Sequence, residues 1–554
     1  MRSIAFAGCA GWIYEGHSRR GVVLCPPLGL EELCGRRTLH LLAQSLSAAG
    51  LPTLRFDYRG EGDSLGDAND AGCAARWRED VSAAIETLKQ ATGVSEIALV
   101  GMRFGSLIAV EIAAGRHDIA RLAMIAPVAA GKTYLRETRI LSRMIQTEGP
   151  QDDHAPDDLG LAGFTLSDET CEAIAAMSIE RLESRPAPAV LLVEQAASRS
   201  GPKISAHFEK LGARVERREF PNYETMMCDP ALSLPAEEIL PGLTQWLAAE
   251  AVVTPRAVRA IVANVLGGDG WSEEGVLFGA LPLAGVYCRP AAETPRRIVV
   301  FAGPGNNHHL GWGRSHVELA RALAKAGVAS LRFDYAGVGD SGGAQTDIYA
   351  AERTADIEAA LDWAHGRDSA PLAIVAVCSG AYHALRIGAK DARIDRLVLL
   401  NQQRYELDLH HRLSWLAYTL QARLVFAIES EDRPSLKTKI LAATLAVLPK
   451  VRRIGSLANR ALRKLKGGGA TADAGPNQPE RQFRAISARG AQALIVHSPT
   501  DPAVAEIERF LGPGGQRASA LAGVRKIVLH DADHLLSSRS ARRIYESELI
   551  AFLS

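Results

Sequence analysis

The 554-residue sequence has no excess charge of either sign, because 63 Lys and Arg balance 63 Asp and Glu. A chain without a net charge has no general electrostatic reason to bind nucleic acid or an anionic membrane surface. It also lacks the run of about 20 apolar residues that a transmembrane segment needs. The N-terminal segment shows neither the apolar core nor the cleavage site of a secretion signal. We therefore expect a cytoplasmic protein with no nucleic-acid partner.

Metal-binding patterns are also missing. The eight cysteines form no CxxC pair, so neither a zinc site nor a thioredoxin-like motif is indicated. The histidine pairs 308/309 and 410/411 do not favour a metal site, since adjacent residues on a helix or strand point in different directions. We expect free, mostly buried thiols and no metal or organic cofactor.

What the sequence does contain is a repeat. Residues 54–64, LRFDYRGEGDS, return as LRFDYAGVGDS at residues 331–341. The length alone suggests two to four domains, and the repeat indicates two. Residues 1–250 are predicted to form the first domain, 251–269 a connector, and 270–554 the second domain.

Around each copy, short apolar runs alternate with helical patterns, which is typical of βαβ units and a mostly parallel sheet. We therefore predict an α/β fold with two tandem domains, each a sheet flanked by helices. The predicted strands of the first domain are 21–25, 51–57, 96–101, 121–125 and 189–194. Those of the second are 298–302, 328–334, 372–377, 396–400, 493–497 and 526–530.

The copies differ most at residues 401–490, which form a longer insertion in the second domain. Lysines and arginines alternate with apolar residues over 435–466, and the Gly/Pro-rich stretch 467–479 reads as a linker. Three interpretations stay open for the basic part: a lid helix, a docking site for an acidic carrier protein, or a helix on a membrane surface.

A nucleophile elbow is predicted at residues 376–380, Ala-Val-Cys-Ser-Gly, between a strand and a helix. The sharp turn of such an elbow needs small residues on both sides of the nucleophile, and Ala376 and Gly380 flank Cys378. The helix N-terminus that follows favours a thiolate. We therefore predict Cys378 as the nucleophile.

A cysteine nucleophile needs a base, and the base needs an orienting acid. Asp501 and His534 each follow one of the next two predicted strands, in the chain order nucleophile, acid, histidine. We predict Asp501 as the orienting acid and His534 as the general base. The backbone N–H groups of Ser379 and Gly305 would form the oxyanion hole.

The first copy has lost these residues. The aligned positions are Arg103 opposite Cys378, Ser198 opposite Asp501, and Thr225 with Met226 opposite His534. We therefore expect no nucleophilic chemistry in the first domain. An arginine at a helix N-terminus needs an anionic neighbour, and two alternatives stay open: an internal carboxylate such as Glu224 or Glu194, or an anionic ligand.

The motif RFDYxGxGDS at residues 55–64 and 332–341, together with the elbow, resembles the α/β-hydrolase superfamily in its serine-aminopeptidase-like branch. In that branch the motif is a structural turn, so the resemblance implies that Asp57, Asp334 and Asp340 are turn residues rather than catalytic acids.

More narrowly, the halves resemble the two hydrolases associated with exosortase and exopolysaccharide gene clusters. One type carries arginine in the elbow, like residues 101–105, and the other cysteine, like 376–380. The resemblance also implies a cap over the active site, at the insertion 401–490.

We expect an enzyme that hydrolyses or transfers an acyl group from a thioester or ester, in exopolysaccharide or secondary-metabolite biosynthesis. Thiolates attack such carbonyls readily. The expected partner is a small acyl substrate, free or bound to coenzyme A or a carrier protein. Two alternatives stay open: a plain carboxylesterase, and a non-catalytic module that binds an anion through Arg103. The oligomeric state is not predicted.

Overall fold

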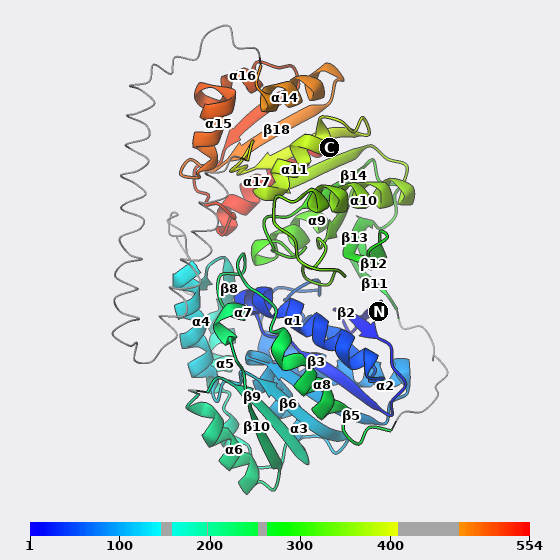
Figure 1. Ribbon diagram of the computed structural model, residues 1–554, viewed down its shortest axis with the longest axis vertical. Coiled ribbons are helices and arrows are strands. Elements are labelled where there is room, and N and C mark those ends of the chain that lie inside the picture. Colours follow the sequence, from blue (N-terminus) through cyan, green and yellow to red (C-terminus); the bar gives the residue numbers. More distant parts are fainter. Residues whose placement is uncertain (146–157, 197, 253–262, 408–475) are drawn as a thin grey trace.

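The computed structural model forms two domains, each a mostly parallel sheet flanked by helices (Figure 1), as the sequence predicts. In Figure 1 the first domain lies below and the second, which ends at the C-terminus, lies above. The residues that the structure describes are 1–145, 158–196, 198–252, 263–407 and 476–554.

The first sheet opens with an antiparallel hairpin and continues as parallel strands. In spatial order its strands are β1 (Arg2–Phe6), β2 (Cys9–Tyr14), β4 (Thr53–Phe56), β3 (Arg20–Cys25), β5 (Glu96–Met102), β6 (Ile119–Ile125), β9 (Ala189–Glu194) and β10 (Arg214–Glu219). A separate hairpin, β7 (Asp158–Leu161) with β8 (Phe164–Ser167), lies outside this sheet.

The second sheet repeats this order with an extra strand at its antiparallel edge. In spatial order its strands are β11 (Val265–Gly268), β12 (Trp271–Phe278), β13 (Leu283–Pro290), β15 (Val328–Phe333), β14 (Arg297–Ala302), β16 (Leu372–Val377), β17 (Ile394–Leu400), β18 (Gln492–His497) and β19 (Val524–Val528).

Helices cover both faces of each sheet, so the central strands are buried throughout. Those of the first domain are α1 (Gly29–Ala48), α2 (Cys73–Thr92), α3 (Phe104–Ala114), α4 (Gly131–Ile145), α5 (Asp168–Ala176), η1 (Ile179–Arg181), α6 (Ser200–Lys210), α7 (Tyr223–Met226), η2 (Glu237–Ile239) and α8 (Leu240–Ala248). Those of the second are η3 (Trp312–Arg314), α9 (Ser315–Lys325), α10 (Ala351–Arg367), α11 (Ser379–Gly388), α14 (Gln478–Ala488), α15 (Ala503–Leu511), η4 (Pro513–Gly515), α16 (Gln516–Ser519) and α17 (Arg539–Leu553).

In each domain two apolar clusters fill the two faces of the sheet. Helices α1 and α8 pack on one face of the first sheet, and α2 and α3 pack on the other. In the second domain α9 and α17 share one face, and α10 and α11 share the other. Within the described ranges, no helix is both long enough and apolar enough to cross a membrane.

Some boundaries differ from the sequence prediction. Helix α1 begins at Gly29, nine residues before the helix that the sequence pattern predicts at 38–49, because Glu32 and Arg36 of its first turns are buried against the other domain. Strand β11 takes four residues of the predicted connector into the second sheet. Most of the insertion 401–490, with all of its basic part, lies outside the described residues, and its end forms α14.

The two copies of the repeated motif meet across the domain interface. Arg55 of the first copy donates to the Asp340 carboxylate of the second, and Arg332 of the second donates to Asp63 of the first at 3.1 Å. Arg36 on α1 adds a bond to Asp340 at 3.0 Å. All of these side chains are buried. This reciprocal pairing is that of a two-fold symmetric dimer, formed here within one chain.

A second pair of arginines repeats the reciprocity. Arg37 and Arg314 occupy aligned positions; Arg37 lies within α1, and Arg314 directly precedes α9. Arg37 donates to three backbone carbonyls of the second domain, those of Gly339, Ser341 and Gly343. Arg314 donates to four carbonyls of the first, those of Gly60, Gly62, Ser64 and Gly66. Each arginine therefore holds the glycine-rich turn of the opposite domain.

The motif aspartates divide between two roles. Asp57 and Asp334 each accept a backbone N–H within their own turn, at 3.0 and 2.8 Å, which is the role that the resemblance implies. The Asp340 carboxylate instead faces the other domain and pairs with two arginines. The interpretation of Asp340 as a turn residue alone is therefore incomplete, because its partners belong to the other half of the chain.

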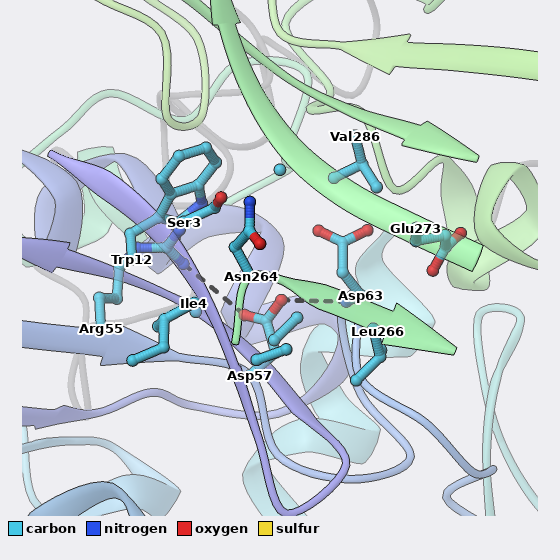
Figure 2. A pocket seen from close by; sticks show the side chains of 14 residues that line it. Ser3, Ile4, Trp12, Arg55, Asp57, Asp63, Asn264, Leu266, Glu273 and Val286 are labelled. Atoms are coloured by element: carbon cyan, nitrogen blue, oxygen red, sulfur yellow. Dashed lines mark hydrogen bonds and ion pairs between the residues drawn. The ribbon is translucent and has the colours of Figure 1, made fainter. Parts of the chain in front are cut away.

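A small pocket lies in the interface, between hairpin β1–β2 and strands β12 and β13. Figure 2 shows Arg55, Asp57 and Asp63 on its first-domain side and Glu273 on its second-domain side. Next to it Gly275 lets β12 approach β1, since a Cβ there would lie 2.7 Å from the Ser3 Cβ. The interface is therefore closely packed where β12 meets β1, and charged where Arg55, Asp63 and Glu273 line the pocket.

His309 links both motif turns. Its Nε2 lies 2.7 Å from an Asp63 oxygen and its Nδ1 lies 3.0 Å from an Asp334 oxygen. Burial alone would lower the pKa of this imidazole, but the two carboxylates outweigh burial and raise the pKa to about 10. His309 is thus an imidazolium at neutral pH, and no free ring nitrogen is left for a metal.

Stability should therefore fall as the pH rises. The folded-state pKa of His309 exceeds the unfolded value of about 6.5, so its contribution is complete below pH 6.5 and is lost as the pH approaches 10. We expect the melting temperature of the wild type to drop about 5 °C more between pH 7 and pH 10 than that of His309→Gln.

The control is His316→Gln. Burial lowers the pKa of His316 to about 3, so it is neutral across this range and should leave the pH dependence unchanged. If the melting temperatures of wild type and His309→Gln fell equally between pH 7 and pH 10, this would contradict a raised pKa for His309.

Candidate active site

The strand β16 runs directly into α11, and Cys378 lies at the junction. Its backbone has φ 53° and ψ −114°, a conformation that non-glycine residues adopt only under strain and that recurs at functional sites. Gly380 permits the turn, because a Cβ there would lie 2.2 Å from the Ala302 carbonyl oxygen. The elbow therefore presents a partly exposed thiol at a helix N-terminus.

His534 and Asp501 lie together beside this thiol. The His534 Nδ1 is 2.5 Å from an Asp501 carboxylate oxygen, which leaves Nε2 for Cys378. Burial lowers the His534 pKa, but interactions with Cys378 and Asp501 outweigh burial and raise it to about 10. About a fifth of the His534 side chain (22%) stays accessible to solvent. The three residues thus have the arrangement of a nucleophile, a base and its orienting acid.

Asn401 holds the loop that carries His534, and the sequence analysis did not identify it. Its buried side chain donates to the carbonyls of His534 and Asp533 at 2.8 and 3.3 Å and accepts the Ser498 N–H at 2.8 Å. Ser498 Oγ donates to the Asp533 carbonyl at 2.8 Å. The ends of β17 and β18 and the histidine loop are therefore tied together. The only sequence signal is an asparagine directly after a predicted strand. In the structure this residue has φ +46°, a conformation that asparagine tolerates better than most residues.

The predicted oxyanion donors lie next to each other but are not equivalent. Ser379 opens α11, where backbone N–H groups have no acceptor within the helix. The Gly305 N–H donates to the Ser379 hydroxyl at 2.8 Å. The Gly305 N–H is therefore already hydrogen-bonded in this structure. It could serve in the oxyanion hole only if the Ser379 hydroxyl moved away.

Two tyrosines that pack on each other lie near the thiol. Tyr349 and Tyr382 pack edge to face with ring centroids 5.1 Å apart, and the Arg386 guanidinium lies 3.4 Å from the Tyr382 ring centroid. Burial, and then the nearby Cys378, raise the pKa of Tyr349 well above its usual value. The surroundings of Cys378 are therefore partly aromatic.

In the first domain Arg103 has nearly the same backbone conformation as Cys378, with φ 52° and ψ −119°. Its guanidinium is buried and bonds to Glu31 at 2.9 Å and Glu137 at 2.7 Å. The prediction of Glu224 or Glu194 as partner was wrong: Glu224 accepts from Gln195 and Glu194 pairs with Arg217. Sequence spacing could not show this, because Glu31 reaches the elbow from the first turn of α1.

Comparisons with known proteins identify the class. Residues 16–152 match the serine aminopeptidase (S33) family model, and residues 298–546 match the alpha/beta hydrolase family model. The chain thus contains two α/β-hydrolase domains in tandem and belongs to that superfamily, whose members include ester-hydrolysing enzymes. No curated protein sequence matches the chain.

Several solved structures are similar to about half of this chain, at low sequence identity. An esterase from Pyrococcus furiosus is 16% identical with a TM-score of 0.34, and the match covers 51% of this chain and 91% of the esterase. A dienelactone hydrolase from Anabaena variabilis is 14% identical with a TM-score of 0.32, covering 51% of this chain and 98% of its own. Est1E from Butyrivibrio proteoclasticus, solved with ferulic acid, is 18% identical with a TM-score of 0.32, covering 45% and 96%.

Replacing Asp501 should change the titration of His534. Removing an opposite charge in contact lowers a pKa by about 1–3 units, so Asp501→Asn should lower the His534 pKa from about 10 toward neutrality. The imidazole resonances followed by NMR against pH measure this directly. Asp533→Asn is the matched control, because that carboxylate binds Ser537 rather than the His534 ring. Equal shifts in both variants would contradict the pairing.

Arg103 should contribute to stability. Arg103→Met leaves Glu31 buried without its partner, and burial already raises the pKa of that carboxyl, offset in part by Arg103. Breaking one side of a buried pair costs about 3–5 kcal/mol, which urea unfolding would detect. The double variant Arg103→Met/Glu31→Gln should recover much of the loss. Full stability in the single variant would refute the structural role.

Proposed function

We propose that the second domain is a cysteine-nucleophile enzyme that hydrolyses or transfers an acyl group from a thioester or ester. The observation that carries this proposal is the position of Cys378: a strained elbow residue at a helix N-terminus, beside an imidazolium that Asp501 orients. Helix N-termini and adjacent imidazolium groups both favour the thiolate, which is the reactive form of cysteine.

In the first half-reaction the Cys378 thiolate attacks the carbonyl carbon of the substrate, and the carbonyl oxygen becomes an oxyanion. The Ser379 N–H at the start of α11 can stabilise this charge. When the intermediate collapses, the bond from carbon to the leaving sulfur or oxygen breaks, and His534 gives its proton to the leaving group. An acyl-thioester on Cys378 and a neutral His534 remain.

In the second half-reaction the acceptor is water or an alcohol. His534 takes a proton from the acceptor as its oxygen attacks the acyl carbon, and Cys378 leaves as the thiolate. The imidazolium is thereby regenerated. Water gives a carboxylic acid and an alcohol gives an ester, so one site supports hydrolysis and transfer.

The substrate class follows from the nucleophile. Acyl thioesters on coenzyme A or on a carrier protein suit a cysteine, because thiol exchange keeps the acyl group activated. The resemblance of the two elbows to exopolysaccharide-associated hydrolases favours a sugar hydroxyl of an exopolysaccharide, or a secondary metabolite, as the acceptor.

Two alternatives remain, and the observations disfavour only the second. A plain carboxylesterase would use the same residues with water as the acceptor. A non-catalytic module that binds an anion through Arg103 has little support, because Glu31 and Glu137 already pair with that guanidinium.

Intact-mass spectrometry tests the proposal. With p-nitrophenyl acetate or an acyl-coenzyme A we expect a single acyl adduct on the wild type and none on Cys378→Ala. Cys171→Ala is the matched control, since Cys171 is the other partly exposed cysteine among the described residues, and the adduct should persist there. An adduct on Cys378→Ala would refute the proposed nucleophile. The lifetime of the adduct in water would separate hydrolase from transferase.

A further inference from the structure

We propose that the triad-less first domain positions the two active-site loops of the second domain through the turn between β7 and β8. The two loops are residues 303–311, which carry Gly305, and residues 529–538, which carry His534. The turn is formed by Ala162 and Gly163 of the first domain. This inference rests on the proposed function of Cys378, but it concerns the part that the other domain plays.

The first loop is anchored at its end by Trp312. The indole Nε1–H donates to the Ala162 carbonyl at 2.5 Å, and the ring packs on Phe164 with centroids 6.0 Å apart. Nearer the elbow, the Asn306 side chain donates to the Ala231 carbonyl at 3.4 Å. The loop that carries Gly305 therefore has contacts with the first domain on both sides of the histidines 308 and 309.

The second loop is anchored through Arg542 on α17. Its guanidinium donates to the carbonyls of Leu536 and Ser537, which follow His534, at 2.8 and 2.7 Å. The same group donates to the Gly313 carbonyl at 2.8 Å and across the interface to the Gly163 carbonyl at 2.7 Å. One buried cation thus joins the histidine loop, the end of the other loop and the first domain.

Direct packing adds to these bonds. Gly163 has φ +93°, and a Cβ there would lie 3.0 Å from the Ser537 backbone, so the turn touches the histidine loop itself. Leu535, the residue after His534, packs on the apolar cluster that contains Ala162 and Trp312. Any displacement of the turn would therefore move the His534 loop.

Small displacements of a catalytic group reduce rates strongly, since proximity and orientation supply much of catalysis. Asn401 fixes the His534 loop from within its own domain, and the turn at Ala162 supports it from the other side. Arg542, Trp312 and Gly163 are positioning residues in this scheme, because none of them is in the triad or the predicted oxyanion hole.

The experiment compares Arg542→Gln with Arg37→Gln in the full chain. Arg37 also donates to backbone carbonyls across the interface, but its targets are in the turn 339–343, which carries no triad residue. Both variants should lose similar melting temperature. We expect the rate of Cys378 acylation by p-nitrophenyl acetate to fall about tenfold in Arg542→Gln and to stay at the wild-type value in Arg37→Gln.

Trp312→Phe serves as a second variant, because it keeps the ring and removes the donor to Ala162; we expect a smaller fall of the same kind. Titration of the His534 imidazole by NMR gives a readout independent of the substrate, and it should shift in Arg542→Gln but not in Arg37→Gln. If Arg542→Gln does not fold, Trp312→Phe decides.

Wild-type acylation and wild-type titration in both Arg542→Gln and Trp312→Phe would overturn the proposal. So would an equal loss of rate in Arg37→Gln, because the effect would then be a general loss of stability. A wild type that no acyl probe modifies would refute the proposed function instead, and the titration would still decide whether the first domain positions His534.

Discussion

The rest of the structure depends on two reciprocal ion pairs across the domain interface, Arg55 with Asp340 and Arg332 with Asp63. Buried ions of this kind are costly to desolvate and are tolerated only with their partners in place. Here each partner comes from the other half of the chain. The halves cannot separate without exposing or stranding these charges, so their relative position is fixed at this point.

That fixed position explains how an elbow without a nucleophile remains useful. The first domain keeps the strained backbone of the elbow at Arg103 but fills the site with ion pairs to Glu31 and Glu137. The space that a substrate would need at its elbow is therefore taken by protein. The same domain contacts the second domain near the loops around Cys378 through Ala162 and Gly163, and such contacts need no triad. The absence of a triad in one half and the presence of the proposed triad in the other are thus compatible with one docked pair.

Sequence patterns predicted the parts that local chemistry determines. The alternation of apolar runs and helices gave the parallel strands, and small residues around Cys378 gave the elbow. Patterns could not reveal Asn401, because its role arises from three loops that meet only in the fold. They also missed the interface role of Asp340, since its partners Arg55 and Arg36 are 285 and 304 positions away in sequence. The exposed, charged strand β10 carries no apolar period and was missed as well.

The reciprocity of the interface has a consequence for how the chain assembles. Each half carries one arginine and one aspartate of these reciprocal ion pairs. Two copies of the same half could therefore form equivalent ion pairs with each other. What selects the unlike pair is the covalent link between the halves, which gives each an effective concentration of the other in the millimolar range. Fusion of the two domains thus selects the partner: every molecule contains one half with the proposed triad and one half without it, in a ratio that expression cannot change.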